Sequence, residues 1–327
     1  MAVELAPFVG ADPDQVKRAA HLCKADLMTG MVGEFASLQG IMGRYYAVAE
    51  GEQPEVAQAI AEHYAPAGPD DMCPSSAVSV AVSLADKIDT LVGFFGLDEK
   101  PTGSRDPYGL RRAALGIIRM ILENGIRLPL LTAFGKAAEL YGVTLLTASG
   151  AISASLIDFF ADRLKVYLRT SGVRHDLIAA VFALGDEDDL VRLVSRVEAL
   201  TRFLESDDGA NLLAAHKRAS NIVAIEEKKD SVRFDGTVNP ALLTNTNEFA
   251  LFESLTTVVA KIQPLLAEEQ YDNVMRILAG LRNPVDKFFD EVTVNADDPA
   301  TRKNRLHLLS QIGAAMGDIA EFNQVEG

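Results

Sequence analysis

The sequence has no tryptophan, two cysteines and no long uninterrupted apolar run. Cys23 and Cys73 are too few for a disulfide framework and lack the paired spacing of a zinc site, so we expect two free thiols. No run approaches the roughly 18 apolar residues of a membrane span, and residues 1–10 lack the basic start and apolar stretch of a signal peptide. We therefore expect a cytoplasmic protein without a membrane partner.

Positive charge is also scarce. Lysine and arginine number 31 against 46 acidic residues, which gives a formal net charge of −15. Binding of nucleic acid needs clustered cations, so this charge taken alone argues against an RNA partner. The acids are, however, concentrated in runs such as GDEDDL, LAEEQYD and VNADDPA, which leaves room for a local basic surface. The sequence also lacks a glycine-rich phosphate loop followed by Lys and Ser or Thr.

What is present is helical patterning over almost the whole chain. The 327 residues contain 48% apolar residues, arranged in short amphipathic runs, and no stretch alternates strictly like a half-buried strand. The length predicts about two domains. Because residues 140–156 are weakly patterned and rich in Ala, Ser, Thr and Gly, we place the boundary near residue 155. The prediction is an all-α protein with domains 1–155 and 156–327.

Helix starts are marked by a capping side chain before proline. Four such pairs are Asp12-Pro13, Asp106-Pro107, Asn283-Pro284 and Asp298-Pro299. Between them, the apolar stripe from Val78 to Phe95 predicts a long, mostly buried helix. In the second domain the periodicity predicts helices over 156–171, 174–184, 186–204, 208–227, 239–244, 247–266, 269–280, 284–291 and 299–321.

The last of these helices has one face that we expect to be buried. Its inward stripe is Leu306, Leu309, Gly313, Met316 and Ala320, at spacings of three and four residues. Lys303 and Asn304 are predicted to point outward.

Five stretches together resemble one protein family. They are KADLMTGMVGEFASLQGIMGRYYA (24–47), ADKIDTLVGFFGL (85–97), PTGSRDPYGLRRAALGIIRMI (101–121), KRASNI (217–222) and PVDKFFDEV followed by RKNRLHLL (284–309). In this order they resemble the beta subunits of bacterial heterotetrameric glycyl-tRNA synthetases. The resemblance covers nearly the whole chain.

That resemblance implies a degenerate HD-like helical domain followed by an anticodon-binding helical bundle of the DALR type. It implies tRNA-Gly and the alpha subunit as partners, within a heterotetramer. ATP and Mg²⁺ would be used in the alpha subunit, so we expect no cofactor and no catalytic residue in this chain. The resembled subunit has a long N-terminal half without a counterpart here, and we therefore expect the sequence to be a fragment.

The HD-like domain departs from the pattern of an active hydrolase. Where a metal-binding His-Asp pair would stand, the chain has Ala25-Asp26, and the later aspartate of the motif corresponds to Asp86. Two carboxylates without the imidazole ligand are a poor set for fixing a metal and activating its water. We expect no metal, and we expect Asp26 and Asp86 to hydrogen-bond or pair with Lys87, Arg111 or Arg112 inside the fold. The alternative is an HD-type metal-dependent phosphohydrolase.

The predicted RNA contacts lie on two helices. Lys217, Arg218 and Asn221 fall opposite the buried stripe of their helix, where cations can hold phosphates and an amide can read a base edge. The alternative is a solvated helix face, in a helical scaffold without an RNA role. Arg302 and Arg305 are further candidates.

For Arg302 and Arg305 the alternative to an RNA contact is a structural ion pair, because a charge on a packing stripe is costly unless it is paired. In that case Arg302 and Arg305 would pair with Asp286, Asp290 or Asp298. Base stacking would have to come from Tyr167, Phe182, Phe203 or Phe252, since aromatic residues make up only 7% of the chain.

Overall fold

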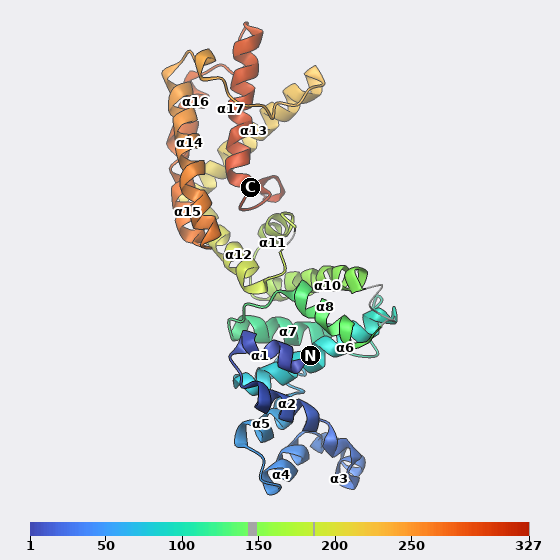
Figure 1. Cartoon of the computed structure of the whole chain (residues 1–327). Coiled ribbons are helices and arrows are strands. Elements are labelled where there is room, and N and C mark those ends of the chain that lie inside the picture. Colours follow the sequence, from blue (N-terminus) through green and yellow to red (C-terminus); the bar gives the residue numbers. More distant parts are fainter. Residues whose placement is uncertain (143–148, 186, 327) are drawn as a thin grey trace. The chain divides into compact units, whose positions relative to one another are not determined.

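The computed structural model describes residues 1–142, 149–185 and 187–326, and every regular element in these ranges is a helix (Figure 1). The β interaction found there is one isolated antiparallel bridge between Thr102 and Arg105. The prediction of an all-α fold is confirmed. The chain forms two compact units, an N-terminal unit of residues 1–170 with 188–191, and a C-terminal unit of residues 171–187 with 192–327.

The N-terminal unit is built around one central helix, α6. Its elements are α1 (Ala2–Val9), α2 (Pro13–Leu22), η1 (Ala25–Met28), α3 (Gly30–Glu34), η2 (Ala36–Leu38), α4 (Ile41–Ala49), α5 (Pro54–Glu62), α6 (Ala77–Gly96), α7 (Leu110–Glu123), α8 (Leu130–Leu140) and α10 (Ser149–Thr170). Helices α1, α2, α5, α7, α8 and α10 all pack on α6. The predicted apolar stripe from Val78 to Phe95 is buried, as expected for a helix covered on most sides.

The first unit extends further along the chain than the sequence predicts. Helix α10 packs on α6, α7 and α8, and it buries Leu156, Phe160 and Leu164. The ring of Phe160 lies 5.2 Å from that of Phe134 in α8. The boundary predicted near residue 155 therefore falls inside α10. The N-terminal unit continues to the end of this helix at Thr170.

The C-terminal unit is a bundle of longer helices. Its elements are α11 (His175–Phe182), α12 (Leu190–Leu204), α13 (Asp207–Asp230), η3 (Pro240–Leu242), α14 (Thr246–Ala267), α15 (Tyr271–Ala279), α16 (Arg282–Glu291), α17 (Pro299–Gly317) and η4 (Phe322–Gln324). They follow the predicted order. By length and mean hydropathy α14 could cross a membrane, which is weak evidence because core helices pass the same test.

Two of the four predicted helix starts are confirmed. The side chains of Asp12 and Asp298 cap α2 and α17, each with proline at the next position. The other two are wrong. Helix α16 begins at Arg282, because Leu281 already has a helical backbone, and Pro284 lies in the first turn, where an N–H is not needed.

Helix α7 begins later than predicted, at Leu110. Its N-cap is Gly109, whose left-handed φ of 66° turns the chain into the helix. Asp106 still acts on this end, since its carboxylate accepts hydrogen bonds from the N–H groups of Leu110 at 2.8 Å and Arg111 at 2.9 Å.

Helix α17 is buried on more than one side. Leu306, Leu309 and Met316 of the predicted stripe are buried. The prediction for Asn304 is wrong, because this side chain is only 4% exposed. It accepts a hydrogen bond from Asn239 N–H at 2.7 Å and donates to Asn239 O at 3.1 Å. Contacts with α13, α14 and η3 cover several faces of α17, so a single inward stripe cannot describe it.

Candidate nucleic-acid interface

The two aspartates of the degenerate HD motif both lie in the N-terminal unit. Asp26 in η1 is buried, and its Oδ2 accepts hydrogen bonds from the N–H groups of Gly40 at 2.7 Å and Gly43 at 3.1 Å. Asp86 in α6 forms an ion pair with Lys24. Both carboxylates thus hold the local fold together.

Two of the cations predicted to pair with these aspartates, Lys87 and Arg111, have other partners. The ammonium of Lys87 is buried and donates to the carbonyls of His63, Tyr64 and Ala65 just beyond the end of α5. Burial lowers the pKa of Lys87 to about 8. Arg111 donates to Gly103 O at 2.7 Å. Lys87 and Arg111 were therefore wrong as partners of the two aspartates, because both serve backbone carbonyls.

Within residues 1–142, 149–185 and 187–326 no group of three or more His, Cys, Asp or Glu side chains could hold a metal ion. His63 lies in the same region but is fully buried, and its Nδ1 is 2.8 Å from the carbonyl oxygen of Ile60. Burial lowers the pKa of His63 and so favours the neutral ring. The absence of a bound metal stays a prediction.

Arg302 in α17 is held by a network of acceptors on neighbouring elements. Its guanidinium forms ion pairs with Glu226 and, at 2.6 Å, with Asp230, both in α13, and it donates to Asn295 Oδ1 at 3.2 Å. Hydrogen bonds from Arg302 and Asn295 lower the pKa of Glu226. The structural alternative predicted pairing with Asp286, Asp290 or Asp298, and for Arg302 these partners were wrong.

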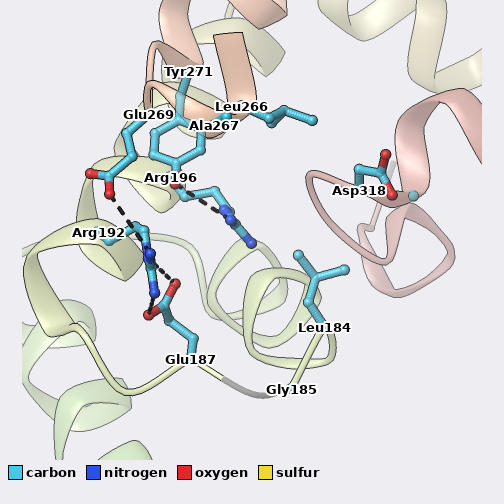
Figure 2. Close-up of a pocket in the computed structure, with 11 residues that line it drawn as sticks. Leu184, Gly185, Glu187, Arg192, Arg196, Leu266, Ala267, Glu269, Tyr271 and Asp318 are labelled. Atoms are coloured by element: carbon cyan, nitrogen blue, oxygen red, sulfur yellow. Dashed lines mark hydrogen bonds and ion pairs between the residues drawn. The ribbon is translucent and has the colours of Figure 1, made fainter. Parts of the chain in front are cut away.

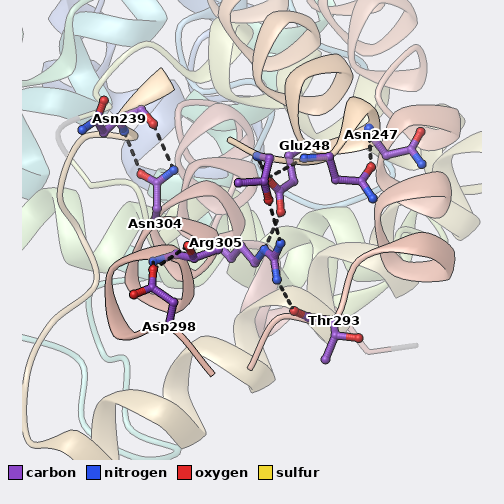
Figure 3. A network of polar contacts seen from close by, with 10 residues as sticks. Asn239, Asn247, Glu248, Thr293, Asp298, Asn304 and Arg305 are labelled. Carbon is purple, nitrogen blue, oxygen red and sulfur yellow. Dashed lines mark hydrogen bonds and ion pairs between the residues drawn. The ribbon is translucent and has the colours of Figure 1, made fainter. Parts of the chain in front are cut away.

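Arg305 joins α17 to the start of α14 (Figure 3). Its Nε forms an ion pair with the fully buried Glu248, and its other nitrogens donate to Thr293 O at 2.7 Å and Thr244 Oγ1 at 3.3 Å. Glu248 also completes a capping box by accepting from the backbone N–H groups of Thr244 and Asn245. The donors of Arg305 are thus used inside the bundle, and the predicted aspartate partners are not among them.

The remaining predicted residues lie on α13, whose ends are well defined. Ser206 caps its start by accepting from Gly209 N–H at 3.1 Å, acidic residues occupy the first turn, and lysines occupy the last turn. One face of the helix buries Leu212, His216 and Ala219. This anchoring fixes the direction of the opposite face.

Lys217, Arg218 and Asn221 lie together on that opposite face. Arg218 and Asn221 are exposed, and Lys217 is half-buried. Among the residues that the structure describes, none of the three forms an ion pair. This distinguishes them from Arg302 and Arg305, which pair with carboxylates.

Arg218 is nevertheless held in position, by an aromatic ring of α16. Its guanidinium lies 4.2 Å from the centre of the Phe289 ring, within the range of a cation–π interaction. Nearer the start of both helices, Arg282 pairs with Asp208 at 2.6 Å, so α16 runs along α13 in the same direction. The stack orients the guanidinium without using its hydrogen-bond donors. We call Lys217, Arg218, Asn221 and Phe289 the α13–α16 face.

Sequence reasoning missed Phe289. The aromatic residues proposed for stacking were Tyr167, Phe182, Phe203 and Phe252, and Phe203 is buried at 6% exposure. A signal for Phe289 was available in the Phe288-Phe289 pair. Successive residues of a helix point about 100° apart, so the burial of Phe288 leaves Phe289 at the edge of the packed face.

The chain matches the models of two known families. Residues 1–183 match the family model described as glycyl-tRNA synthetase beta subunit, and residues 212–321 match the DALR anticodon binding domain. The α13–α16 face lies within the second match.

Two similar relatives are the glycine–tRNA ligase beta subunits of Rhodospirillum centenum, 54% identical over 332 residues, and Phenylobacterium zucineum, 53% identical over 330 residues. Each comparison covers 100% of this chain and 46% of the relative. The chain thus spans about half the length of the curated relatives that it matches. It belongs to the glycyl-tRNA synthetase beta subunit family.

Proposed function

We propose that this chain is the tRNA-binding part of a glycine–tRNA ligase beta subunit and contacts the anticodon region of tRNA-Gly. In this proposal the chain supplies no catalytic residue or cofactor. Glycylation is carried out with an alpha subunit, which uses ATP and Mg²⁺, within a heterotetramer in the cytoplasm. The observation that carries the proposal is the α13–α16 face, an arginine stacked on an aromatic ring beside a lysine and an amide.

The chemistry of this face suits a single-stranded loop of RNA. Lys217 and Arg218 supply donors for backbone phosphates, and the planar guanidinium of Arg218, held on the Phe289 ring, offers a surface on which an unstacked base can stack. Asn221 carries the donor and acceptor pair needed to read a base edge. Because glycine codons require cytosines at the second and third anticodon positions, these bases are the ones to be read.

The net charge of −15 limits the expected strength of binding. With few phosphates neutralised, the slope of log affinity against log salt should be small, on the order of −2 to −4 by the counterion-release relation. Sequence discrimination then has to come from base contacts. Replacing either anticodon cytosine should weaken binding by about 1 to 3 kcal/mol.

The test is a fluorescence-anisotropy titration of the tRNA-Gly anticodon stem-loop with the full chain at fixed salt. Asn221→Ala should remove most of the preference for the matched anticodon, while Lys261→Ala, an exposed cation on α14, serves as the control. If wild type binds matched and swapped stem-loops equally, anticodon reading is excluded. If it binds neither, the proposed function fails.

A separate experiment addresses the hydrolase alternative. Elemental analysis of the purified chain should find no stoichiometric manganese, iron, zinc or other transition metal, and phosphate esters should not be cleaved. One tightly bound metal per chain that is lost, together with esterase activity, in Asp86→Ala would establish the HD-type phosphohydrolase instead.

A further inference from the structure

The C-terminal unit contains a cavity of about 430 Å³ (Figure 2). No residue of the α13–α16 face is among its lining residues. It is formed by the segment after α11, the first half of α12, the turn between α14 and α15, and the end of α17. Its charged lining residues are Glu187, Arg192, Arg196, Glu269 and Asp318. A volume of this size is in the range of small-ligand sites, roughly 300 to 1,000 Å³.

The three carboxylates of this cavity have partners in the structure. Arg192 donates to both oxygens of Glu187, at 2.7 and 2.8 Å, and lies 3.8 Å from Glu269. Asp318 accepts a hydrogen bond from Gln263 at 2.8 Å. Arg192 is therefore neutralised by its own acidic neighbours.

Arg196 differs from Arg192, one turn earlier on the same helix. Its guanidinium points into the cavity beside Tyr271 and Leu184 (Figure 2). It lies 5.2 Å from the centre of the Tyr271 ring and contacts the phenol oxygen at 3.4 Å. Within the described ranges it forms no ion pair, and its buried Nε has no hydrogen-bond partner.

The unpaired guanidinium of Arg196 favours the binding of an anionic ligand in this cavity. A half-buried cation with unused donors is costly, and a charged acceptor that enters the cavity removes this cost. The ring of Tyr271, itself only 3% exposed, holds the guanidinium in one orientation in advance. Planar N–H groups held in this way match the oxygens of a phosphate.

We propose that this cavity binds one phosphodiester of the RNA backbone through Arg196, with Tyr271 as the positioning residue. This rests on the proposed function and adds a second contact point for the same RNA. A singly charged phosphodiester fits the site better than a dianionic phosphate or nucleotide. The lining carries three carboxylates and two arginines, so each further negative charge on the ligand adds repulsion from Glu187, Glu269 and Asp318.

The test compares three variants in the stem-loop titration at several salt concentrations. Arg196→Gln removes the charge but keeps an amide, Arg196→Lys restores the charge, and Arg202→Gln is the matched control. Arg202 lies on the same helix, but it is exposed and paired with Asp272 at 2.9 Å. Urea unfolding of each variant checks that the bundle is intact.

Arg196→Gln should weaken RNA binding about 5- to 20-fold and reduce the magnitude of the salt slope by about one. Arg196→Lys should recover the slope and part of the affinity, and Arg202→Gln should match wild type. A parallel titration follows the Arg196 Nε–H resonance by NMR with dimethyl phosphate, inorganic phosphate and acetate as probes. The resonance should shift most with dimethyl phosphate.

Two results would overturn this inference while the proposed function stands. One is unchanged affinity and slope in Arg196→Gln while Arg218→Ala binds RNA weakly. The other is a resonance that shifts with acetate or inorganic phosphate but not with dimethyl phosphate, which would assign the cavity to a carboxylate of a protein or to free phosphate. A wild-type chain that binds no RNA at all would instead remove the proposed function, and this inference with it.

Discussion

Two sets of basic residues in the C-terminal unit have similar sequence patterns and different surroundings. Arg302 and Arg305 on α17 direct their guanidinium groups to Glu226, Asp230 and Glu248 of neighbouring helices. On α13, Lys217 and Arg218 form no ion pair with any residue that the structure describes, and Arg218 stacks on Phe289. The comparison indicates that a basic residue of this strongly acidic chain keeps its donors free only where the fold places no carboxylate beside it.

Of the substitutions that test this comparison, the largest change in the free energy of unfolding is expected at Arg305. Replacing Arg305 with methionine leaves the fully buried Glu248 without its cation, so the free energy of unfolding should fall by about 3 to 5 kcal/mol. Urea denaturation followed by circular dichroism measures this. A second replacement, Glu248→Gln, should recover part of the loss, because the amide can still accept from Thr244 and Asn245 N–H.

Arg202→Gln is the control for this experiment, since Arg202 forms an exposed ion pair and should contribute less than about 1 kcal/mol. If Arg305→Met is as stable as this control, Arg305 does not hold the bundle together and regains its place as a candidate RNA contact.

A smaller effect is expected at Arg302, and it depends on pH. Hydrogen bonds from Arg302 and Asn295 lower the pKa of Glu226 below the ordinary glutamate value of 4.5. A carboxylate with a lowered folded pKa stabilises the protein above its unfolded pKa, and this contribution disappears as the pH falls through the folded pKa. Wild type should therefore lose stability below about pH 4.5, and Arg302→Ala should lose less over the same interval.

The measurement is the urea midpoint of both proteins at pH 7 and at steps below pH 5. Arg302→Ala should be less stable at pH 7, and the two midpoints should converge in acid. If the urea midpoints of the two proteins differ by the same amount at every pH, the ion pair with Glu226 does not contribute to the pH dependence of stability.

The sequence predicted the helices of the second domain well because their ends carry local signals. Asp298-Pro299 marks the start of α17, and the spacing of Leu306, Leu309 and Met316 marks its packed face. Such features depend on neighbours along the chain. The stripe of α6 was predictable for the same reason.

Features that depend on distant neighbours could not be predicted. The partner of Arg305 is Glu248, 57 residues away, and the acids expected for it were those nearby in the sequence. Asn304 was assigned to solvent because helical periodicity alone does not show that Asn239 lies against it, 65 residues away. The position of α10 in the N-terminal unit likewise follows from its packing on α6, α7 and α8.

The candidate RNA-binding site was predictable in part. The pattern of α13 placed Lys217, Arg218 and Asn221 on one face, and the structure brings them together there. Phe289 and Arg196 were missed because each depends on a second helix that reaches the site, α16 for the first and α15 for the second.

The smallest effect on stability is expected on the α13–α16 face. Arg218→Ala removes an exposed cation–π contact, so the unfolding free energy should change by no more than about 1 kcal/mol. Lys217→Ala should change it less. These variants can therefore be compared with wild type in binding experiments without a correction for unfolding.

The most direct test of the central claim is the salt dependence of stem-loop binding for wild type, the double variant Lys217→Ala/Arg218→Ala, and Arg302→Lys. We expect the double variant to bind matched and swapped stem-loops about 10- to 100-fold more weakly, with a slope reduced in magnitude by about two. Arg302→Lys should match wild type in affinity and slope. A double variant that binds like wild type, together with a weakened Arg302→Lys, would contradict the account and place the RNA contact on α17.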